Sequence, residues 1–250
     1  MKILISPTKT MKMAASSDGV PGRPLFLEKT AAIAKAVQAL SYEEAKKLWN
    51  CNDTLARLNF DRFQTMNVLK NTVPAVCLYD GLQFKYMRVE TMSAQEKQYL
   101  NDHLRILSGF YGLLSPFDGI VPYRLEMQSK ISIGGTSNLY DFWGKELYKA
   151  SMDEDHTIIQ LASKEYAKCI DRYAEKHDHI ITVEFLTWQH GTLRQQSTYA
   201  KMGRGDMVRF LAAQKAEAPE VMKSYRGLGF RFDGEKSNEG RYVFIKNGEV

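Results

Sequence analysis

The sequence predicts a mixed α/β fold in a single compact domain over residues 1–250, with a central mixed sheet and surrounding helices. Short runs of β-branched and apolar residues, which are typical of strands, alternate with segments whose apolar residues recur at helical spacing. A length of 250 residues suits one large domain or two small ones, and no low-complexity linker divides the chain. The strands and helices follow no regular strand–helix–strand repeat, which favours a mixed sheet.

The first predicted elements are a buried strand and two helices. Residues 1–5 are mostly apolar and are followed by a Ser-Pro pair, which ends the strand. The stretch 11–24 is rich in Ser, Gly and Pro and is expected to be a loop. A helix is predicted over 28–40, and Ser41 with Glu44 then forms a capping box that opens the next helix.

The middle of the chain predicts two further helices around a strand. A helix is expected over 53–63, and the apolar run 73–79 has the composition of a buried strand. Ser93 with Glu96 forms a second capping box. The helix that it opens carries an apolar stripe at i, i+4 and i+7, formed by Leu100, Leu104 and Leu107. Gly109 then stands where a helix commonly ends in a left-handed residue.

The C-terminal half predicts strands with two helices among them. We expect helices over 138–150 and 205–214, and strands over 156–161, 179–188, 192–199, 229–232 and 241–245. His190-Gly191 is expected to join 179–188 and 192–199 as a hairpin, and Asp233-Gly234 to turn the chain between the last two strands.

Composition excludes several classes of protein. Hydrophobic residues make up 44% and charged residues 25%, as in soluble globular proteins. No apolar run is long enough for a membrane span and no signal peptide is evident, so we expect a cytoplasmic protein with no membrane partner. The three cysteines are far apart and form no CxxC pair, which supports neither a disulfide framework nor a zinc knuckle.

Positive charge is concentrated near the C-terminal end. The net charge is +5, and residues 194–246 contain 11 Lys and Arg against 6 Asp and Glu. Such an excess is expected of a region that faces phosphate groups, although a solvated basic face would have the same composition.

Three polar clusters stand at predicted element ends, where scaffolds commonly present functional side chains. Lys9 lies in the hydroxyl-rich loop after the first strand, which suits anion binding. Arg124 and Glu126 follow Pro122, and Tyr199, Lys201 and Arg204 form the third cluster. Basic side chains next to an aromatic ring suit a nucleic-acid backbone with an unstacked base.

We expect Lys9, Arg124, Glu126 and Lys201 to converge on one cleft, with the first strand central and the Lys9 loop near residues 103–127. Three cations and a carboxylate would suit a phosphate or the edge of a planar nucleobase. The alternative is a surface pair of Arg124 with Glu126 and two unrelated lysines.

No metal or cofactor site is expected. His177 and His179 have H-x-H spacing, but no third ligand is evident nearby. The sequence also contains no HExxH, Walker or GxGxxG motif.

The segment LSGFYG at 107–112 is similar to a helix-hairpin-helix element, in which a glycine hairpin after a helix presents N–H groups to a DNA phosphate. Two residues separate Gly109 from Gly112, where the usual hairpin has one, and Pro116 interrupts a second helix. We nevertheless expect both glycines to be critical for the backbone.

Six blocks of sequence match one family in order: ILISPTKT at 3–10, YDGLQF at 79–84, HLRILSGFYGLLSPFDGIVPYRLEM at 103–127, LYDFWG at 139–144, LASKEY at 161–166 and TYAKMGRGDMVRF at 198–210. Together they resemble the YaaA family of bacterial peroxide-stress-resistance proteins. The chain departs from the family pattern at Gln128, where a Gly is usual, and at Met202, where many relatives carry a basic residue.

The resemblance implies a compact α/β protein of the peroxide stress response that binds DNA through a basic cleft and limits iron-dependent damage. It also implies an alternative, an enzyme acting on a nucleobase-like small molecule of the deazaguanine type, because some relatives act in such pathways. An iron-binding protein is disfavoured by the scarcity of His and Cys clusters. The candidate DNA- or anion-binding residues are Lys9, Arg105, Gly109, Gly112, Tyr123, Arg124, Glu126, Tyr199, Lys201 and Arg204.

Overall fold

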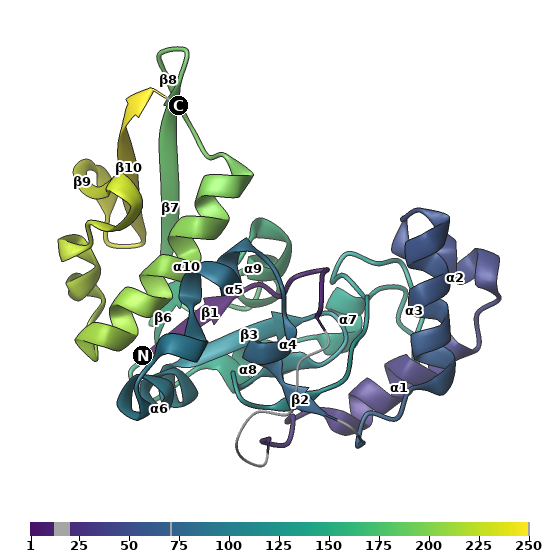
Figure 1. Ribbon diagram of the computed structural model, residues 1–250. Coiled ribbons are helices and arrows are strands. Elements are labelled where there is room, and N and C mark those ends of the chain that lie inside the picture. The colour runs from purple at the N-terminus through teal and green to yellow at the C-terminus, as the bar shows by residue number, and fades with distance from the viewer. Residues whose placement is uncertain (13–20, 71, 250) are drawn as a thin grey trace.

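The computed structural model describes residues 1–12, 21–70 and 72–249, and its centre is a mixed sheet (Figure 1). The strand order is β4-β3-β1-β6-β7-β10-β9, with β8 paired to β7. Strands β3, β1, β6, β7 and β10 run parallel, whereas β4, β8 and β9 are antiparallel to their neighbours. The bounds are β1 Lys2–Ile5, β3 Leu104–Ser108, β4 Gly112–Leu114, β6 Thr157–Gln160, β7 His179–Gln189, β8 Thr192–Arg194, β9 Phe230–Asn238 and β10 Arg241–Glu249. A separate pair joins β2 Val73–Pro74 to β5 Gly119–Ile120.

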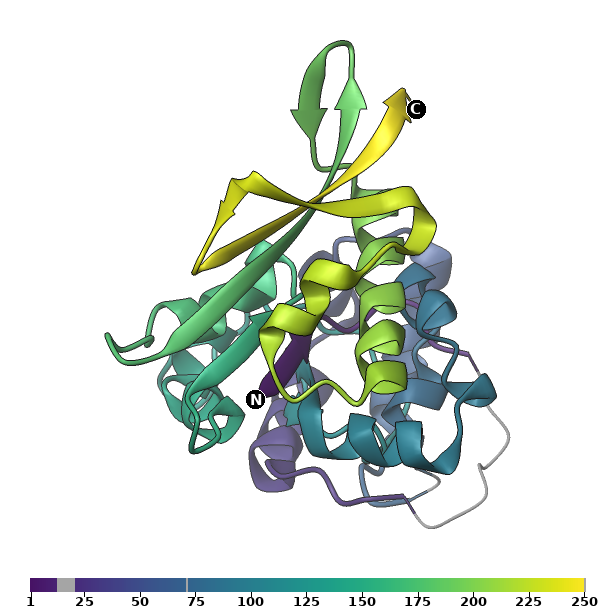
Figure 2. The same ribbon diagram turned by 90° about the vertical axis from the view of Figure 1, so that its left-hand side faces the viewer.

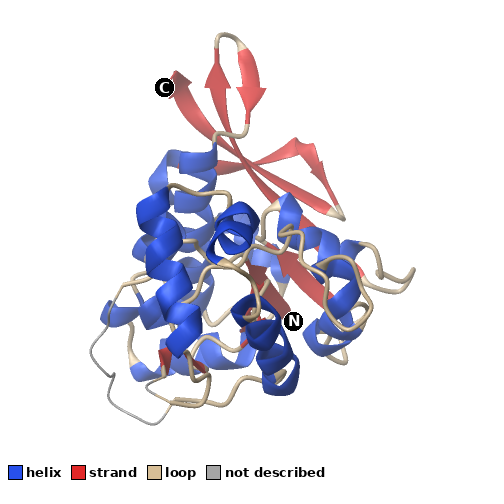
Figure 3. Cartoon of the chain, turned by 90° about the vertical axis from the view of Figure 1, so that its right-hand side faces the viewer, coloured by secondary structure: helices blue, strands red, loops and turns tan. Residues whose placement is uncertain are grey.

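Helices cover both faces of the sheet (Figure 2). One face carries α5 Leu82–Met87, α6 Ala94–His103 and α10 Ser197–Gln214, and the other carries α7 Leu139–Trp143, α8 Glu146–Ser151 and α9 Lys164–Asp171. Beyond the sheet, α1 Leu27–Gln38, α2 Tyr42–Trp49 and α3 Asp53–Thr65 form a helical lobe, seen in front in Figure 3. The remaining helical segments are α4 Ala75–Leu78 and the 3₁₀ turns Val89–Thr91, Pro219–Ser224 and Gly227–Gly229.

Apolar burial explains why β1 lies at the centre. Ile3, Leu4 and Ile5 have no exposed surface, because β1 is paired on both sides and covered on both faces. A parallel strand buried in this way needs an apolar run rather than an alternating pattern. The predicted central position of the first strand is therefore confirmed.

Several local predictions are also confirmed. Ser41 caps α2 and Ser93 caps α6, and in both cases the glutamate three residues later completes the capping box. The predicted helices over 28–40 and 53–63 correspond to α1 and α3. Strands β7 and β8 form the predicted hairpin across His190-Gly191. Residues 13–20 of the loop predicted over 11–24 lie outside the described part of the chain.

The stripe of Leu100, Leu104 and Leu107 was wrongly assigned to one helix. Helix α6 ends at His103, and Leu104 to Ser108 form β3. Spacing of i, i+4 and i+7 arises by coincidence here, because β3 pairs with β1 and β4 and is apolar along most of its length. Similarly, the strand expected over 73–79 is a two-residue strand followed by the short helix α4.

The helix-hairpin-helix element is not formed by the residues predicted for it. Residues 107–112 are the hairpin between β3 and β4. Gly109 lacks a positive φ and is needed for another reason, because an added Cβ would lie 2.8 Å from the Leu125 carbonyl oxygen. Gly112 does have a positive φ of 75° and packs against Trp143. Both glycines are buried, so neither presents its backbone at the surface.

The boundaries of several other elements also differ from the predicted ones. The helix predicted over 138–150 is divided into α7 and α8 at Gly144, whose φ is +54°. The strand predicted over 192–199 ends at Arg194, and α10 begins at Ser197, eight residues before the predicted helix start. Strands β9 and β10 are longer than predicted, and Glu239-Gly240 rather than Asp233-Gly234 joins them.

Among the described helices, none combines the length and apolar composition that crossing a bilayer requires.

Candidate functional site

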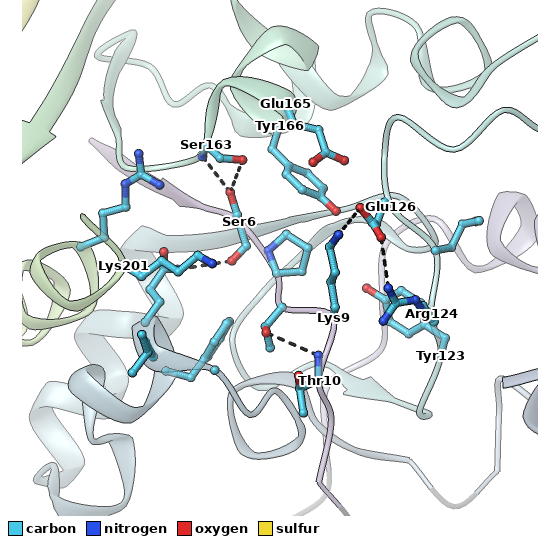
Figure 4. A pocket seen from close by; sticks show the side chains of 18 residues that line it. Ser6, Lys9, Thr10, Tyr123, Arg124, Glu126, Ser163, Glu165, Tyr166 and Lys201 are labelled. Atoms are coloured by element: carbon cyan, nitrogen blue, oxygen red, sulfur yellow. Dashed lines mark hydrogen bonds and ion pairs between the residues drawn. The ribbon is translucent and has the colours of Figure 1, made fainter. Parts of the chain in front are cut away.

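A pocket of about 510 Å³ lies at the carboxyl ends of β1 and β6. Five segments line it: residues 6–10 after β1, 81–84 at the start of α5, 123–126, the group Ser163, Glu165 and Tyr166 at the start of α9, and Lys201 with Arg204 on α10. These segments are far apart in sequence and meet only in the folded chain (Figure 4).

Topology explains why a pocket forms there. Strand β1 lies between β3 and β6, so the chain builds the sheet on one side of β1 and then returns to build the other. In open parallel sheets, ligands bind outside the carboxyl ends of the strands at such a switch point, because loops leaving in opposite directions open a crevice.

Glu126 links two cations on one side of the pocket. Its Oε2 lies 2.6 Å from Lys9 Nζ, and its Oε1 lies 3.6 Å from an Nη atom of Arg124 (Figure 4). The Arg124 side chain is only 12% exposed, whereas that of Lys9 is 57% exposed. The buried Nε of Arg124 has no hydrogen-bond partner among the described residues. Arg124 is therefore positioned by Glu126, and its Nε–H remains available to donate to a ligand.

Arg204 is the second buried cation of the pocket. It is 8% exposed, makes no ion pair or hydrogen bond with the described residues, and its Nε has no partner. Burial lowers the pKa of Arg204 to about 10. A guanidinium with that pKa remains charged at neutral pH, so the pocket contains a positive charge that no described side chain balances.

Two glycines bring Arg204 to this position. An added Cβ on Gly203 would lie 2.6 Å from the Phe185 ring, and one on Gly205 would collide with the Gln83 carbonyl oxygen. Helix α10 thus packs closely onto β7 through one glycine and onto α5 through the other. The Gly-Arg-Gly sequence places the arginine between these two close contacts.

Glu165 supplies a second carboxyl group. Burial raises the pKa of Glu165, and the neighbouring Glu126 charge also raises it, while the Gln128 N–H and Lys9 act in the opposite direction. The Gln128 N–H donates to Glu165 Oε1 over 3.2 Å. The pocket therefore contains two carboxyl groups in different environments: Glu126, which contacts Lys9 and Arg124, and Glu165, whose pKa is raised by burial.

Hydroxyl groups order the walls of the pocket. The Ser163 N–H donates to Ser6 Oγ over 2.8 Å, which ties the loop after β1 to the start of α9. Tyr123 O–H lies 2.6 Å from both the Ser108 and the Tyr79 hydroxyl oxygens, and all three are buried. These bonds fix the backbone that presents Arg124 and Glu126.

The sequence was compared with family profiles and with known proteins, and both comparisons identify one family. The profile of the family described as peroxide stress protein YaaA matches residues 1–236. Relatives described as UPF0246 proteins include one from Agathobacter rectalis, 44% identical over 246 residues that cover 98% of each chain. One from Lachnoclostridium phytofermentans is 42% identical over 98% of this chain and 96% of its own, and one from Lactiplantibacillus plantarum is 42% identical over 98% and 99%.

The chain belongs to the YaaA family.

The structure brings together six of the ten candidate residues named from the sequence. Lys9, Arg124, Glu126 and Lys201 line the same pocket, as expected, together with Tyr123 and Arg204. The Lys9 loop also lies beside the 103–127 segment, as predicted.

The other four candidates do not line this pocket. Arg105 lies on β3 and donates to the Asn101 and Leu104 carbonyl oxygens. Tyr199 lies under the Lys246 ammonium group, 4.5 Å from its ring centre. Gly109 and Gly112 are in the core. Of the basic residues in 194–246, only Lys201 and Arg204 reach the pocket.

Sequence reasoning missed the residues contributed by α9. Ser163, Glu165 and Tyr166 lie in the YaaA-like block LASKEY, directly after a predicted strand. That position was the available signal, because the carboxyl ends of neighbouring parallel strands meet at one edge. The parallel pairing of β1 with β6 was needed to recognise it.

Proposed function

We propose that this member of the peroxide stress family binds DNA and holds one nucleotide of it in the pocket. The observation that carries the proposal is the buried Arg204, which shares the pocket with three further cations and has no partner among the described residues. A buried guanidinium without a counter-charge costs free energy, and a phosphate oxygen would remove that cost.

The dimensions of the pocket define which part of the DNA would enter. A volume of about 510 Å³ is in the range of small-ligand sites, which admit a nucleotide but not a duplex. The nucleotide would therefore be unstacked from its neighbours, as in proteins that bind single strands or extruded bases. Phe84 and Tyr166 offer aromatic surface, and Glu126 offers an acceptor for base N–H groups.

In this proposal the protein acts in the cytoplasm and helps to limit iron-dependent damage, because DNA covered by protein is less accessible to oxidants formed from peroxide. Cleavage of a supercoiled plasmid by Fe²⁺ and hydrogen peroxide measures this protection. Wild-type protein is expected to slow nicking, whereas an Arg204→Met variant at the same concentration is expected not to.

The DNA-binding prediction is tested by substituting Arg204 with Met. Met keeps an unbranched chain but removes the charge, so affinity for a duplex with one unpaired nucleotide should fall roughly 10-fold or more. The fold should remain intact or gain stability, since replacing an unpaired buried charge by an apolar side chain is often stabilising. Fluorescence anisotropy at several salt concentrations measures the affinity, and the salt dependence should weaken in the variant.

Lys215→Met is the matched control, because Lys215 is an exposed lysine at the end of the same helix and loses the same charge. Its affinity should stay within about twofold of wild type. Equal DNA affinity of wild type and Arg204→Met would remove the pocket from the interface and contradict the proposal.

The second candidate function is an enzyme that acts on a free nucleobase-like molecule of the deazaguanine type. It is favoured by the two carboxyl groups in different environments, since Glu126 is ion-paired and burial raises the pKa of Glu165. Such pairs commonly divide acid and base roles. Thermal shifts with free deazaguanine bases and with DNA separate the two functions: a base-induced shift that is independent of salt favours the enzyme, and a DNA-induced shift that disappears at high salt favours DNA binding.

A further inference from the structure

A cluster of two histidines and an aspartate lies at the opposite end of the sheet from the pocket. His156 precedes β6, and His177 and Asp178 precede β7. One potential ligand atom from each of the three lies within 4.8 Å of the other two. We propose that these residues bind a divalent transition-metal ion of the Zn²⁺ class.

The distances in the cluster suit such an ion. Asp178 Oδ1 lies 3.0 Å from His156 Nδ1 and 3.6 Å from His177 Nε2. Ligand atoms around a tetrahedral zinc ion with bonds of about 2.0–2.2 Å stand about 3.3–3.6 Å apart. Small rotations of the two imidazoles would therefore give bonding geometry without movement of the backbone.

Asp178 is oriented before any ion binds. Its side chain is 1% exposed, and its Oδ2 accepts from the Tyr148 hydroxyl and from the Glu175 backbone N–H, both over 2.7 Å. Oδ1 is left facing the two imidazoles. Outer hydrogen bonds of this kind fix ligand orientation in metal sites and raise affinity.

The backbone holds the histidines close together as well. His156 has a φ of +49°, and its carbonyl oxygen accepts from the His179 N–H over 2.9 Å. The two rings lie 4.3 Å apart in an edge-to-face arrangement. The side chains of His156 and His177 are 40% and 56% exposed, so an ion can enter from solvent and keep water as its fourth ligand.

The ligand set selects the class of ion. Two imidazoles and one carboxylate suit Zn²⁺, Co²⁺ or Ni²⁺, whereas Mg²⁺ and Ca²⁺ prefer oxygen ligands alone. The nearby Lys145 does not oppose the ion directly, because its Nζ is paired with Glu175 at 2.7 Å. A bound ion would join the loop before β6 to the loop between α9 and β7.

This position gives the ion a structural role. The pocket lies at the carboxyl ends of β1 and β6, whereas the His156 cluster lies at the amino ends of β6 and β7. An ion there would stabilise the folded chain by binding to it and not to the unfolded chain, and it would not touch a ligand in the pocket.

Cobalt binding to chelator-treated protein tests the site, because Co²⁺ in a tetrahedral nitrogen and oxygen site has visible absorption that the aqueous ion lacks. We expect one Co²⁺ per chain with this absorption, its displacement by Zn²⁺, and a higher unfolding midpoint with Zn²⁺. His177→Ala should weaken binding roughly 10-fold or more and remove the shift of the midpoint.

His179→Ala is the matched control, because His179 is a neighbouring histidine outside the cluster, and its ring makes a hydrogen bond with the Glu239 carbonyl oxygen. Its Co²⁺ affinity should match that of wild type. His177 is exposed, so its variant is expected to fold, and circular dichroism checks this. Absence of the absorption in wild-type protein, or equal affinities of the two variants, would overturn the proposal and leave the cluster as a His156–Asp178 hydrogen bond with His177 beside it.

Discussion

At the scale of single residues, the pocket contains ionisable side chains whose burial lowers the stability of the folded chain. Arg204 and Glu165 are both ionisable groups that the fold has partly removed from water. Each would cost less free energy as a neutral group of the same shape. Their retention is understandable if a ligand supplies the missing partners, which is also the usual origin of a compromise between stability and activity.

Glu165→Gln is predicted to stabilise the protein at neutral pH. A carboxyl group whose pKa is raised above its ordinary value of 4.5 favours the fold below that pH, and this contribution is lost as pH rises through the folded-state pKa. Gln keeps an acceptor for the Gln128 N–H but carries no charge. The unfolding midpoint should rise by roughly 1–3 °C at pH 7.

The same comparison at low pH is the control for this prediction. Near pH 4 wild-type Glu165 is mostly protonated, so the two proteins should unfold within about 1 °C of each other. A constant difference between the two pH values, or a less stable variant at pH 7, would contradict the assignment of a raised pKa.

Part of the pocket could be predicted from the sequence, because some of its residues follow features that neighbouring residues reveal. Lys9 and Arg124 follow a strand and a proline, and such ends are visible in the chain itself. The burial of Arg204 could not be predicted, because it depends on contacts of Gly203 with Phe185 and of Gly205 with Gln83. Both contacts join different elements of the fold, and contacts between elements leave no periodic signal in the sequence.

At the scale of elements, helix starts were predicted correctly where a side chain caps the backbone of the first turn. Both capping boxes fixed a helix start to the residue, since their hydrogen bonds lie within four positions. The end of α6 was predicted wrongly because Leu104 and Leu107 fit a helical stripe equally well. Pairing with β1, 100 residues earlier, makes this segment a strand.

Gly205→Ala is predicted to separate α10 from α5. The added methyl group would collide with the Gln83 carbonyl oxygen, a backbone atom that cannot rotate away. Overpacking of this kind costs about 1–3 kcal/mol, so the unfolding midpoint should fall by several degrees. DNA affinity should fall as well, because the adjacent Arg204 moves with the helix.

Gly234→Ala serves as the control substitution, since an added Cβ there would have only the Phe232 ring nearby, at 3.7 Å. Chemical denaturation of the two variants and of wild type gives the comparison. If Gly205→Ala is as stable as Gly234→Ala, close packing of α10 is not what positions Arg204.

At the scale of the whole molecule, both halves of the chain build the pocket and the sheet. Lys9 comes from the first half, Glu126 from the midpoint of the chain, and Glu165, Lys201 and Arg204 from the second half. Strand β1 likewise takes one neighbour, β3, from the first half and the other, β6, from the second. Neither half contains the whole central sheet or the whole pocket.

Limited proteolysis is therefore predicted to give no pair of stable fragments divided near residue 130. A cut after the exposed Lys130 would leave each half with an unpaired parallel strand edge, so the pieces should either stay associated or be degraded together. Mass spectrometry of a tryptic time course measures this. Two fragments that persist and separate on a sizing column would mean two domains.

The central position of β1 also determines when the sheet can form during synthesis on the ribosome. Ile3 pairs with Leu104 and with Ile159, so β1, which is synthesised before both of its neighbours, cannot complete its pairing until about 156 further residues have followed. At about 5–20 residues per second this delay is about 8–30 s, during which an apolar segment stays exposed. Chaperone occupancy of nascent chains should therefore begin early and end only after β6 emerges, and refolding yield should fall as protein concentration rises.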